Sequence, residues 1–158
     1  MGTRMELVAG DLQAVLVALG TGERGGFDDR SRFPAYLSLS GGMDPTWLDL
    51  FAEAARMATE SETPGDFLDA RAELEGAGEL DEALTIERVE PGWITAVAGI
   101  PDRALDAVAG RWIDRLEEEL GPLPREEKPW IRELAGQVIG FCRTADRAPD
   151  VLFVWSLR

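Results

Sequence analysis

Two segments in the second half of the chain carry apolar residues at the spacing of one helix face. The first set is Leu105, Val108, Ala109, Trp112, Ile113 and Leu116. The second set is Ile131, Leu134, Ala135, Val138, Ile139 and Cys142. Both patterns predict amphipathic helices with the apolar stripe turned towards a core, so the thiol of Cys142 is expected inside.

Helix-start signals predict further helices earlier in the chain. Asp11 can cap a helix over residues 12–19, and Asp44-Pro45 opens one that runs to about residue 58. Thr63-Pro64 has the same cap-then-proline form and predicts a short helix over residues 64–74. Glu90-Pro91 opens a helical turn that reaches Ile100.

Four short segments have strand character: residues 6–9, 35–39, 84–89 and 150–157. The last is almost continuously apolar, which is typical of a strand covered on both faces. The order of elements predicts an α+β fold, formed as one domain over residues 1–158. We expect about five helices packed on a small sheet of three to four strands, with the C-terminal strand central.

Composition removes most familiar catalytic chemistry. The chain has 158 residues, no histidine, one cysteine and, in Lys128, one lysine. Zinc sites and Ser-His-Asp or Cys-His relays need side chains that are missing here. The GxGxxG match at residues 20–25 continues into a polar stretch that ends at Pro34, which favours a loop over a nucleotide site. We therefore expect no catalytic residues, no metal and no cofactor.

The location and the start of the chain give weaker indications. The apolar stretches are too short to cross a membrane, and no secretory signal is visible. With a lone thiol, a cytoplasmic protein with no membrane partner is expected. Met5 offers an alternative natural start, which would make residues 1–4 a cloning remnant.

Charge is the main asymmetry of the sequence. The net charge is −14, and residues 60–90 hold eleven carboxylates against two arginines, or −9. On the predicted helix over residues 64–74, three of these acids share one face. The candidate partner-binding residues are Asp66, Asp69, Glu73, Glu75, Glu79, Asp81 and Glu82. Such a surface repels nucleic acid and attracts a basic protein, although it could equally serve solubility alone.

The tryptophans and the many acids leave two other interpretations open. Trp93 and Trp130 lie near helix starts, where we expect the most exposed indoles, and they could line a pocket for an apolar ligand. Two of the 30 carboxylates could serve a small carboxylate-dependent hydrolase or a metal-dependent enzyme, but their spacing selects none.

Residues 86–157 resemble the second half of the YfbM-like family of uncharacterised bacterial proteins. The layout is carried by the strand and helix start Ile-Glu-Arg-Val-Glu-Pro-Gly-Trp, the segment Val-Ile-Gly-Phe-Cys-Arg-Thr-Ala-Asp and the closing Val-Leu-Phe-Val-Trp. The resemblance implies a small α+β cytoplasmic protein and transfers no catalytic residue.

These observations favour a non-enzymatic, cytoplasmic protein-binding module with an acidic surface. It would act as an immunity-type or regulatory partner of a basic protein. A homo-oligomer is compatible with the sequence.

Overall fold

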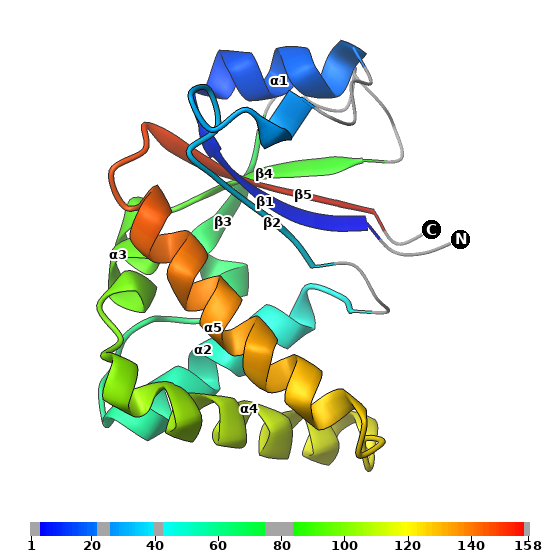
Figure 1. Cartoon of the computed structure of the whole chain (residues 1–158), viewed down its shortest axis with the longest axis vertical. Coiled ribbons are helices and arrows are strands. Elements are labelled where there is room, and N and C mark those ends of the chain that lie inside the picture. Colours follow the sequence, from blue (N-terminus) through cyan, green and yellow to red (C-terminus); the bar gives the residue numbers. More distant parts are fainter. Residues whose placement is uncertain (1–3, 22–25, 40–42, 75–83, 157–158) are drawn as a thin grey trace. The chain divides into compact units, whose positions relative to one another are not determined.

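The computed structural model of the chain describes residues 4–21, 26–39, 43–74 and 84–156, which form an α+β fold (Figure 1). The chain divides into two compact units. The sheet unit comprises Met1–Asp44, Arg71–Pro91 and Thr144–Arg158, and the helical unit comprises Pro45–Ala70 and Gly92–Arg143. The prediction of one domain over the whole chain stays a prediction.

The sheet unit is built on five antiparallel strands in the order β2-β1-β5-β4-β3. The strands are β1 (Arg4–Gly10), β2 (Ala35–Ser38), β3 (Arg71–Glu73), β4 (Thr85–Val89) and β5 (Asp150–Ser156). The apolar C-terminal strand β5 lies in the middle of this order, as its sequence predicts.

The expectation of three to four strands is wrong because β3 has no strand pattern of its own. Its sequence is only Arg-Ala-Glu. It becomes a strand by pairing with β4, from Arg71 opposite Val89 to Glu73 opposite Glu87. The backbone N–H of Leu74 extends the ladder by donating to the carbonyl of Ile86 at 3.1 Å.

Helix α1 (Leu12–Thr21) lies along one face of the sheet (Figure 1). The predicted cap is confirmed, because Asp11 Oδ2 accepts a hydrogen bond from the backbone N–H of Ala14 at 3.1 Å. The helix closes a core with strands β1, β4 and β5 and with the segment that follows the helix. The residues of this core are Val8, Val15, Ala18, Phe27, Phe33, Ile86, Leu152 and Val154.

The other four helices are α2 (Thr46–Thr59), α3 (Pro91–Ala98), α4 (Leu105–Leu120) and α5 (Glu127–Ala145). Helices α2 and α4 pack against each other around Trp112, which is fully buried. Its indole N–H donates to the carbonyl of Trp47 at 2.9 Å, and its ring lies 5.1 Å from that of Phe51. Cys142 on α5 is also fully buried, which confirms the expected place of the thiol.

The predicted helix over residues 64–74 is wrong. Only Phe67–Ala70 is helical, as one 3₁₀ turn, and β3 follows it directly. The buried residues Pro64, Phe67 and Ala70 recur at every third position. This spacing matches the three residues per turn of a 3₁₀ helix and is shorter than the turn of an α-helix. None of the helices in the described ranges is both long and apolar enough to cross a membrane.

Candidate functional site

The structure separates the acids that the sequence predicts as one surface. Asp66 and Asp69 belong to the helical unit, whereas Glu73 lies on β3 of the sheet unit. Because the helix over residues 64–74 does not form, these three carboxylates do not share a helix face, and that prediction is wrong. The other four candidates, Glu75, Glu79, Asp81 and Glu82, lie outside the described residues.

The acids that remain together occupy residues 60–70, which we call the acidic loop. The helical unit holds fifteen carboxylates against eight basic residues, or −7, and the acidic loop supplies four carboxylates and no basic residue, or −4. More than half of the net charge of this unit therefore lies in the loop.

The acidic loop begins at a tight end of α2. Glu60 has a φ of 52°, in the left-handed region, and its backbone N–H donates to the carbonyl of Arg56. The N–H of Ser61 donates to the same carbonyl at 3.1 Å. These bonds close the last turn of the helix and reverse the chain, which then runs back along α2.

Arg56 ties the loop to this helix a second time. One guanidinium nitrogen, Nη1, donates to the carbonyl of Pro64 at 2.8 Å, and Nη2 donates to Asp66 Oδ1, also at 2.8 Å. The Arg56 side chain is only 26% exposed. Arg56 is therefore engaged by the loop, and it neutralises one of the four carboxylates, Asp66.

Three further contacts hold the second half of the loop. The N–H of Leu68 donates to Asp49 Oδ1 at 2.6 Å. The indole N–H of Trp93 donates to the carbonyl of Gly65 at 2.9 Å, and the Trp93 ring lies 4.8 Å from the ring of Phe67. Phe67 is fully buried. The backbone of the loop is thus fixed at several points.

The expected exposure of Trp93 is wrong, because the acidic loop packs on it and leaves it 4% exposed. Trp130 is half-buried, with its ring 6.2 Å from that of Trp47, as the sequence expects for a tryptophan near the surface. A ligand-binding role for either indole stays a prediction.

The outward side of the loop combines charge with one apolar side chain. The exposed residues include Glu60, Glu62, Asp66, Leu68 and Asp69. Leu68 is 62% exposed, the highest value among the large apolar side chains of the described residues. The loop therefore presents a leucine among carboxylates on a fixed backbone.

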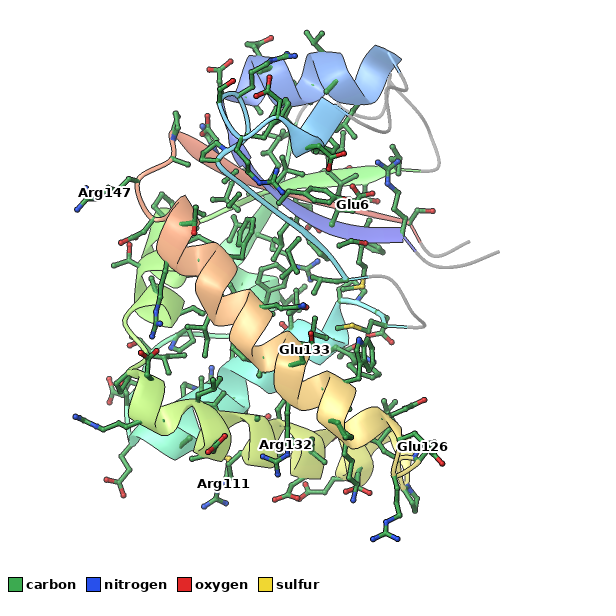
Figure 2. All side chains as sticks on the ribbon, viewed as in Figure 1. Glu6, Arg111, Glu126, Arg132, Glu133 and Arg147 are labelled. Carbon is green, nitrogen blue, oxygen red and sulfur yellow. The ribbon has the colours of Figure 1, made fainter. Side chains whose placement is uncertain are left out.

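Sequence reasoning missed a polar cluster on the sheet unit, centred on Glu6 (Figure 2). Glu6 is 7% exposed, and its carboxylate accepts hydrogen bonds from the Tyr36 hydroxyl, at 2.8 Å, and from the guanidinium of Arg4. The pKa of Tyr36 is raised to about 12. Burial is the largest cause, and the hydrogen bond to Glu6 and the negative charge of Glu6 add to it. The phenol is therefore neutral near pH 7 and acts as a hydrogen-bond donor.

A second missed cluster lies on the neighbouring strands β3, β4 and β5. Arg71, with a side chain 4% exposed, donates to Glu87 Oε1 at 2.9 Å. The indole N–H of Trp155 donates to the same oxygen, and the guanidinium lies 5.3 Å from the centre of the Phe153 ring. Glu87 belongs to the acidic segment 60–90, but its carboxylate binds a buried arginine of the same chain and is not offered to a partner protein.

No other chemistry is indicated by the described ranges. Within them, no group of three or more His, Cys, Asp or Glu side chains is placed to hold a metal ion. No protein-family model, no curated protein and no solved structure matches this chain. The carboxylate-dependent enzyme stays a prediction, and the acidic loop is the candidate surface that lies within the described residues.

Proposed function

We propose that the chain is a non-enzymatic, cytoplasmic protein-binding module whose acidic loop docks on a basic partner protein, as an immunity-type or regulatory partner does. The observation that carries the proposal is the lack of free positive charge on the loop. Four carboxylates project from residues 60–70, and the adjacent Arg56 is already bonded to Pro64 and Asp66.

The fixed backbone supports a binding role over a solubilising one. A solubilising surface needs charge but no fixed conformation. The acidic loop, in contrast, is hydrogen-bonded to α2 through Asp49 and Arg56 and to α3 through Trp93. A surface held in one conformation before association loses less conformational entropy when it binds. Its carboxylates would also speed the approach of a positively charged protein, and added salt would weaken this attraction.

The experiment combines affinity capture with a charge variant of the loop. Immobilised protein is exposed to an extract of the organism that encodes it, and each retained basic protein is identified, purified and titrated by calorimetry. The loop variant carries Glu60→Gln, Glu62→Gln and Asp69→Asn. The matched control carries Asp106→Asn, Asp114→Asn and Glu133→Gln, which neutralise three exposed acids of α4 and α5; Glu133 is labelled in Figure 2.

The proposal predicts a basic partner whose Kd rises with salt, about tenfold or more weaker binding by the loop variant, and wild-type binding by the control. Equal losses in both variants would show that net charge alone matters and would contradict a specific docking loop. Failure of the wild-type protein to retain any basic protein would contradict the proposal as well.

A further inference from the structure

We draw no further inference here: the strongest candidate, the uncharged outer face of helix α1 around Val17, is an exposed apolar surface of the sheet unit, but nothing in the structure shows what covers it.

Discussion

The carbonyl oxygen of Gly65 accepts a hydrogen bond from the indole N–H of Trp93 at 2.9 Å. This bond joins the middle of the acidic loop to the first turn of α3, and the Trp93 ring packs on Phe67 at the same place. The fixed position of the exposed carboxylates therefore depends on a buried tryptophan that carries no charge.

Trp93→Phe should keep most of the ring packing and lose the hydrogen bond to Gly65. We expect the free energy of unfolding to fall by about 1 kcal/mol, because the hydrogen bond from the Trp93 indole to the Gly65 carbonyl is lost. Amide hydrogen exchange at Leu68 should become faster, which NMR can follow. Trp130→Phe should leave the exchange at Leu68 unchanged, and equal acceleration in both variants would argue against the anchoring role of Trp93.

Glu60 holds a backbone conformation that favours glycine, with a φ of 52°. Glu60→Gly should therefore raise the free energy of unfolding by about 1 kcal/mol in urea denaturation. Glu60→Ala removes the same charge but keeps the left-handed strain, so it should not stabilise the fold. If the acidic loop docks on a basic protein, both variants should bind that protein more weakly than the wild type. A Glu60→Gly variant that is more stable and binds with full affinity would show that the Glu60 carboxylate is not needed for binding.

The hydrogen bond between Tyr36 and Glu6 should appear in the titration of the phenol. Tyr36 is the only tyrosine in the chain, so its ultraviolet difference spectrum reports one group. Its pKa is raised from 10.0 to about 12, so its contribution to stability is complete below pH 10 and is lost as the pH rises through about 12. Glu6→Gln should lower the midpoint while keeping it above 10.0, because burial is the largest cause of the shift.

A midpoint near 10 for the Tyr36 titration of the wild-type protein would contradict the burial of the phenol and its hydrogen bond to Glu6. Tyr36→Phe provides the control for stability, since its free energy of unfolding should lack the decline that the wild type shows between pH 10 and about 12.

Arg71 and Glu87 form a pair that is costly to break from one side. Arg71→Met should lower the free energy of unfolding by about 3 kcal/mol, because it leaves a largely buried carboxylate without its cation. The double variant Arg71→Met, Glu87→Gln should recover part of this loss, since the neutral amide still accepts from Trp155. A double variant that is no more stable than Arg71→Met in chemical denaturation would contradict the coupling.

Local sequence patterns predicted the elements that form from their own residues. The stripe from Val108 to Leu116 lies buried on α4, and the continuous apolar run of β5 lies at the centre of the sheet. In both cases the period of the side chains and the period of the backbone agree, so no distant residue is needed to choose the structure.

The elements that escaped prediction depend on distant partners. Strand β3 forms because Arg71 pairs with Val89 across the sheet, and the Thr63-Pro64 signal fails to start an α-helix where Arg56 binds the Pro64 carbonyl. Glu6 and Tyr36 meet only through the register of β1 and β2. Such registers carry no local signature, so neither polar cluster was visible in the sequence.

Part of the candidate site was predictable and part was not. The excess of carboxylates in residues 60–90 pointed to Asp66 and Asp69, which are exposed on the acidic loop. The exposure of Leu68 was not predicted, because two adjacent apolar residues, Phe67 and Leu68, look alike in sequence whichever of them is buried. Its outward position follows from the packing of Phe67 on Trp93.

The most direct test of the docking account is an NMR titration of isotopically labelled protein with the captured basic partner. The account predicts that the largest amide shift changes fall within residues 57–70, with Leu68 among them and with weaker changes at higher salt. Unchanged amides across the acidic loop, with the shifts concentrated around Glu6 and Tyr36 or on α5, would place the interface elsewhere and contradict it.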